Sequence, residues 1–153
     1  MLTIQYTLVT LVAYLGLLAG VIISLLAKEE LSAGRKYFVL LQHSLFVTTL
    51  LLTLYAHKTA SWISYSLILI IVLVLTFART KNTSIVAYPV LGAILFLNRS
   101  ASNTFFLTAA LIFLYGMPTA ALHVHARKRG FVRLFLLSVS FLVVSLGLYF
   151  LLG

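Results

Sequence analysis

The sequence predicts an all-α protein, a polytopic transmembrane helical bundle of about six spanning helices joined by short loops. Of the 153 residues, 63% are hydrophobic and only 8% are charged, whereas about a quarter of the residues in soluble domains are charged. The apolar residues form long runs without the two-residue alternation of a β-barrel. At ~20 residues per span, residues 1–153 fit a single integral membrane domain.

Six apolar stretches lie between polar breaks, and each predicts one helix. The first is too long for the apolar region of a signal peptide and lacks a basic segment before it, so we expect a retained helix. The fourth stretch is only ~21 Å long at 1.5 Å per residue. We expect a short spanning helix there, with a re-entrant segment as the alternative. The predicted helices cover about 6–27, 37–56, 61–78, 84–97, 103–122 and 131–152.

Basic residues alternate between successive loops. Nine of the 11 Lys and Arg residues lie in or beside loops 28–36, 79–83 and 123–130. Since cytoplasmic loops collect Lys and Arg, we expect these three loops in the cytoplasm and both termini outside the cell membrane. The net charge of +9 is thus explained by topology, with anionic lipid headgroups as partners of the basic loops and without nucleic-acid binding.

The loop after the first helix holds the only two acidic residues, Glu29 and Glu30, close to Arg35 and Lys36. Carboxylates at the end of one helix and basic residues at the start of the next oppose the helix dipoles. Topology explains the basic pair but not the carboxylates. Two interpretations stay open: local ion pairs within the loop, or a cytoplasmic contact site for a cation, a headgroup amine or a partner protein.

Polar residues are rare in the predicted spans, which makes those present candidates for a site. Gln42 and His43 are neighbours in the second span, and His123 and His125 precede Arg127 at the end of the fifth. Each can form a structural hydrogen bond across the bundle or belong to a polar or acid–base site. The spacing of the last two histidines disfavours a chelating pair, and the chain has no Cys. We therefore expect no metal and no cofactor.

Glycine and proline mark two further features. Gly16 and Gly20 form a G-x-x-x-G pattern, which suits close contact between helices in a membrane. Pro89 and Pro118 interrupt the fourth and fifth spans. Each proline frees a backbone carbonyl and permits a kink, and interrupted helices often line transporter sites.

None of these features names a reaction. The chain has no Asp, no carboxylate in an expected span and no nucleophile or nucleotide-binding motif. We therefore expect neither enzymatic activity nor ion-coupled transport. The leading hypothesis is a non-enzymatic membrane module, a subunit or scaffold of a membrane complex. It would bind another membrane protein or a second copy of the chain through its first and fifth loops and the glycine-bearing face of its first helix.

Two alternative functions stay open. The first is a small facilitator or channel gated around Pro89 and Pro118, with Gln42, His43 and Thr48 along its path. The second is a membrane enzyme that acts on a lipid headgroup at the cytoplasmic face, with one of the histidines named above as acid or base. Ordinary structural surroundings for those histidines would count against the enzyme.

Overall fold

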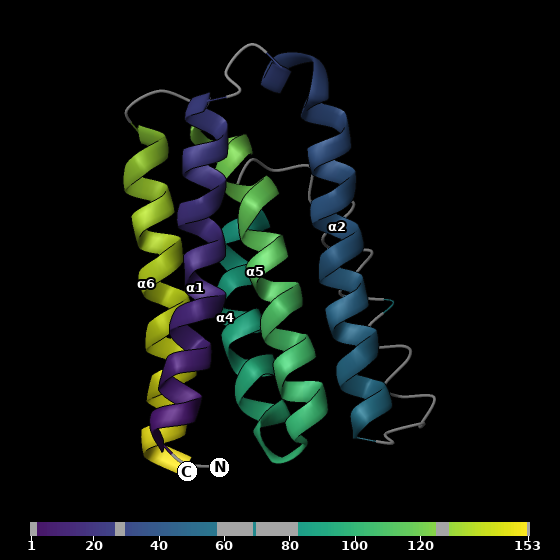
Figure 1. Ribbon diagram of the computed structural model, residues 1–153, viewed down its shortest axis with the longest axis vertical. Coiled ribbons are helices and arrows are strands. Elements are labelled where there is room, and N and C mark those ends of the chain that lie inside the picture. The colour runs from purple at the N-terminus through teal and green to yellow at the C-terminus, as the bar shows by residue number, and fades with distance from the viewer. Residues whose placement is uncertain (1–2, 27–29, 58–68, 70–82, 125–128, 153) are drawn as a thin grey trace.

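The predicted all-α membrane bundle is confirmed by the computed structural model (Figure 1), which describes residues 3–26, 30–57, 69, 83–124 and 129–152. All regular structure in these residues is helical. The short 3-10 turn η1 connects the fourth and fifth helices. The elements are α1 (Thr3–Leu26), α2 (Glu30–Ala56), α4 (Thr83–Leu97), η1 (Asn98–Ser100), α5 (Ser102–Val124) and α6 (Arg129–Leu152).

About four spans lie among the described residues, whereas six were predicted for the whole chain. The four helices that are long and apolar enough to cross a membrane are α1, α2, α5 and α6. Helix α4 has 15 residues, or ~22 Å, which is short of a ~30 Å hydrocarbon core. The predicted span 61–78 lies outside the described residues, apart from Leu69.

Helix α2 also begins earlier than the apolar pattern indicated. It starts at Glu30, so most of the predicted loop 28–36 is helical. The stretch contains Glu, Ala, Arg and Lys, all of which favour a helix. Apolar runs mark where a helix crosses lipid, whereas the backbone hydrogen bonds continue into the polar region beyond. The part of α2 that could span a membrane is Gly34–Ala56.

Helix α5 occupies the centre of the bundle, with α1 and α2 as its main neighbours, while α4 packs mainly against α6. Figure 1 shows α1 and α5 running in one direction and α2, α4 and α6 in the other. The end of α1, the start of α2, the end of α5 and the start of α6 therefore share one end of the bundle. The two termini lie at the opposite end.

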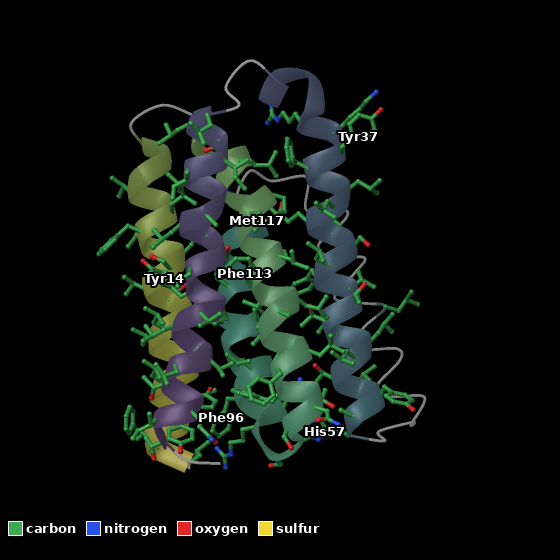
Figure 2. All side chains as sticks on the ribbon, viewed as in Figure 1. Tyr14, Tyr37, His57, Phe96, Phe113 and Met117 are labelled. Carbon is green, nitrogen blue, oxygen red and sulfur yellow. The ribbon has the colours of Figure 1, made fainter. Side chains whose placement is uncertain are left out.

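The contact between α1 and α5 requires glycine. A Cβ on Gly16 would overlap the backbone of Phe113, and one on Gly20 would lie 2.6 Å from the Cα of Met117. Phe113 and Met117, labelled in Figure 2, lie on the side of α5 that faces α1. On α5, a Cβ on Gly116 would meet the backbone of α1 at 2.5 Å. The two backbones thus approach more closely than any larger residue allows.

The outer faces of the helices are largely apolar, and the interior contains polar side chains as well as apolar ones. Exposed large hydrophobic residues follow the outside of α1, from Ile4 to Leu26, and recur on α2 and α6. Buried hydroxyl groups such as Thr10 and Thr49 donate to the carbonyl four residues earlier in their own helix. A water-soluble bundle has the reverse distribution, so the chain is an integral membrane protein.

Candidate functional site: a polar seam between three helices

A row of buried polar side chains follows the line along which α2 and α5 meet. In each helix the three positions are separated by seven and four residues, which places them on one helix face. Because the two helices run in opposite directions, the ends of the two rows match. We call this row the polar seam. It consists of Gln42, Thr49 and Thr53 on α2 and Thr108, Tyr115 and Thr119 on α5.

At one end of the seam, Gln42 joins α2 to α5. Its Nε2 donates hydrogen bonds to the Tyr115 hydroxyl at 3.1 Å and to Thr119 Oγ1 at 2.9 Å. The Thr119 hydroxyl in turn donates to the Tyr115 carbonyl at 2.8 Å. Tyr88 of α4 packs edge-on against Tyr115, with ring centroids 5.6 Å apart. We call these four residues the Gln42 cluster.

The Tyr88 hydroxyl in this cluster is buried without a hydrogen bond. The residue is only 3% exposed, and its hydroxyl has no hydrogen-bond partner among the described residues. Thr119 lies near enough to interact with it, but the two groups do not meet hydrogen-bond geometry. Leaving a buried donor unpaired costs about 1–3 kcal/mol. The fold therefore leaves the Tyr88 hydroxyl without a hydrogen-bond partner among the described residues.

At the other end of the seam, Asn98 connects three elements. Asn98 opens η1 and is fully buried, and its Nδ2 donates to Thr53 Oγ1 at 2.9 Å and to Thr108 Oγ1 at 3.0 Å. Its Oδ1 is buried and has no hydrogen-bond partner within the described part of the chain. Exchanging the amide nitrogen and oxygen would again leave one of the two atoms unpaired. We call Asn98, Thr53 and Thr108 the Asn98 cluster.

Gln42, His43 and Thr48 do not share one path. Gln42 belongs to the seam, but the adjacent His43 is only partly buried and Thr48 is exposed. His43 uses its Nδ1 for a 2.7 Å hydrogen bond with the carbonyl of Val39, one turn earlier in the same helix. The reason is geometric, since successive residues on a helix diverge by ~100°.

His123 lies next to the seam rather than in it. Its Nδ1 forms a 2.8 Å hydrogen bond with the carbonyl of Thr119, so it stands one turn beyond the Gln42 cluster. His125 lies outside the described residues. Within the described residues, no three His, Cys, Asp or Glu side chains gather as a metal site would require.

The predicted contact site is described only on its basic side. Arg35 and Lys36 are exposed, and Lys36 Nζ lies 5.2 Å from the centroid of the Tyr37 ring. Figure 2 shows Tyr37 pointing away from the bundle. Glu29 and Arg127 lie outside the described residues, and Glu30 is described only as the first residue of α2.

The two prolines both adjoin the Gln42 cluster. Pro89 follows Tyr88 in α4, and Pro118 precedes Thr119 in α5. Both helices continue through their proline. The structure thus gathers Gln42 and both predicted interruption points in one region.

Sequence reasoning missed most of the seam. Asn98 stands at a polar break and is typical of a loop, while single Thr and Tyr residues are common in spans. The spacing of seven and four residues, present in both helices, was the available signal. No protein family, no curated protein and no solved structure was found to match the chain.

Proposed function

We propose that this membrane protein is a non-enzymatic module that serves as a subunit or scaffold of a membrane complex. The proposal rests on the exposed basic end of α2, formed by Arg35, Lys36 and Tyr37. Tyr37 is 64% exposed, and Arg and Tyr are enriched where proteins bind one another. An acidic surface of a partner protein fits this surface. We include Glu29 and Glu30 in the contact site on their sequence position alone.

The described histidines each make a hydrogen bond within their own helix. His43 and His123 bond through Nδ1 to the carbonyl four residues earlier. A bond of this kind fixes the ring and its tautomer and does not by itself identify a substrate position. The glycine-bearing face of α1, which the sequence offered as a partner surface, is occupied by α5 within the chain. The basic end is therefore the better candidate for partner binding.

We further propose that the basic end faces the cytoplasm and that both termini lie outside. The alternation of basic loops supports this orientation, as does the gathering of α-helix ends in Figure 1. A topology reporter fused after Gly153 is expected to report the outside, and one inserted at Gly130 the cytoplasm. Reporters that reverse this pattern, or that both report one side, would contradict the proposed orientation.

The contact role predicts a loss of partners without a loss of stability. We expect Arg35→Gln and Lys36→Gln each to lower recovery of a co-purifying protein or anionic lipid about fivefold, as for ~1 kcal/mol per basic residue near an anionic surface. The charge-matched control is Lys58→Gln, which lies between the predicted helices 37–56 and 61–78. Quantitative mass spectrometry after purification from native membranes measures the recovery. Thermal stability should stay unchanged because exposed charges contribute little. Unaltered recovery in both variants would contradict the proposed contact site.

A small facilitator is the second candidate function, and one observation favours it. Gln42 and both proline-bearing segments meet in the Gln42 cluster, where the Tyr88 hydroxyl has no hydrogen bond among the described residues. Transporters place their sites where polar groups converge near the middle of the membrane, although neither α4 nor α5 is interrupted at its proline. His43 and Thr48, which were predicted to line the path, lie outside this cluster. Tyr88, Tyr115 and Thr119 accompany Gln42 instead.

A further inference from the structure

Three stretches of the chain supply polar side chains at the same two levels of the bundle. In each stretch, the two polar positions are ten or eleven residues apart, which corresponds to ~15–17 Å along a helix. Both levels therefore fit inside a ~30 Å hydrocarbon core. The pairs are Gln42 and Thr53 on α2, Tyr88 and Asn98 on α4 and η1, and Thr119 and Thr108 on α5.

Between the two levels, apolar side chains lie beside the seam. Phe46 and Leu50 of α2 and Ile112 of α5 are buried in the same core cluster. Thr49 lies among them, but its hydroxyl donates to the Leu45 carbonyl at 2.7 Å, so its proton is already used. We call Phe46, Leu50 and Ile112 the apolar collar. The arrangement is polar, apolar and polar along one line.

The unpaired atoms define the chemistry of a ligand. At one level the Tyr88 hydroxyl offers a donor, and at the other Asn98 Oδ1 offers an acceptor. A molecule that suits both levels must accept and donate hydrogen bonds, as water, alcohols and amides do. Neither cluster contains a charged side chain. Arg99, which follows Asn98, lies over the Phe96 ring and donates to the Leu152 carbonyl. A cation would therefore lack a counter-charge within the hydrocarbon, which favours a neutral ligand.

We propose that the polar seam binds water and other small neutral molecules at its two clusters and passes them across the membrane when the apolar collar opens. The proposal rests on the second candidate function. The collar acts as a hydrophobic constriction, which excludes water until its side chains separate. Pro89 and Pro118, beside the Gln42 cluster, supply the positions where α4 and α5 can bend.

The test uses the purified full chain in phosphatidylcholine vesicles and stopped-flow light scattering. Water efflux is measured in a sucrose gradient, glycerol entry in a glycerol gradient and K⁺ entry in a potassium salt gradient. Tyr88→Phe removes only the unpaired hydroxyl and Thr108→Val one hydroxyl of the Asn98 cluster. Each is expected to slow both fluxes about fivefold, as for one lost hydrogen bond. Thr48→Val, on the exposed face of α2, is the matched control and should leave the rates unchanged.

Each outcome decides a separate point. Fluxes of water, glycerol and K⁺ that all equal those of protein-free vesicles overturn the facilitator, and passage along the seam with it. If Tyr88→Phe and Thr108→Val leave the water and glycerol fluxes unchanged, the protein can still be a facilitator, but the polar seam is not its path. A K⁺ flux that matches glycerol entry overturns the neutral ligand. If Thr108→Val fails to fold, Tyr88→Phe decides alone, because the hydroxyl it removes makes no hydrogen bond with the described residues.

Discussion

Replacing Gly16 by alanine is expected to lower the free energy of unfolding by about 3 kcal/mol, at the upper end of the usual cost of overpacking. The added Cβ would overlap the Cα, carbonyl carbon and carbonyl oxygen of Phe113. These are backbone atoms in the middle of α5, which cannot rotate away as the end of a flexible side chain can. The two helices must therefore separate. The change is measured by unfolding the protein in mixed micelles of increasing SDS content.

Gly147 provides the matched control on α6. A Cβ at this position would meet no heavy atom within 4 Å, so Gly147→Ala adds the same methyl group to open space. Because alanine favours a helix by about 1 kcal/mol over glycine, stability is expected to stay level or rise. Equal losses in the two variants would show that the α1–α5 contact does not depend on the missing Cβ of Gly16.

Replacing Asn98 by alanine is expected to cost about 2 kcal/mol, which reflects two lost interhelical hydrogen bonds in a buried position. The Asn98 amide is the only side chain among the described residues that hydrogen-bonds to both Thr53 of α2 and Thr108 of α5. Without it, the end of α2 at Ala56 loses its polar link to the bundle. SDS unfolding measures the loss, and hydrogen exchange should become faster around Thr53.

Asn103, which is exposed at the start of α5, is the control for this substitution. Asn103→Ala removes the same amide from a position that contacts lipid or solvent, and we expect a change below about 0.5 kcal/mol. A double-mutant cycle of Asn98→Ala with Thr108→Val isolates the hydrogen bond itself. A coupling energy near zero would mean that Asn98 acts through packing alone.

The sequence predicted the helices well because its signal is local. Long apolar runs follow from the need to satisfy every backbone group inside lipid, so α1, α5 and α6 begin and end within a few residues of the predicted limits. The start of α2 was misplaced because a helix continues beyond the apolar run that marks its passage through lipid. Among the predicted helices that the structure describes, the fourth is not long enough for a full span, because α4 has only 15 residues.

The packing of single residues was harder to predict. Gly16 and Gly20 suggested close helix contact, but the pattern does not identify the partner helix. Only the structure places them against Phe113 and Met117 of α5. Likewise, Gln42 was a candidate polar residue, whereas its partners stand 73 and 77 residues further along the chain.

The sequence by itself thus determined the secondary structure and the surroundings in which the chain folds. It is a basic, apolar chain whose helices lie in a membrane. Only the tertiary structure decided which side of each helix faces inward. The spans are apolar nearly all round, so no amphipathic stripe orients them. Orientation depends instead on where two backbones can approach and where a buried amide such as that of Asn98 finds its partners. Because these contacts join residues far apart in sequence, local patterns do not encode them.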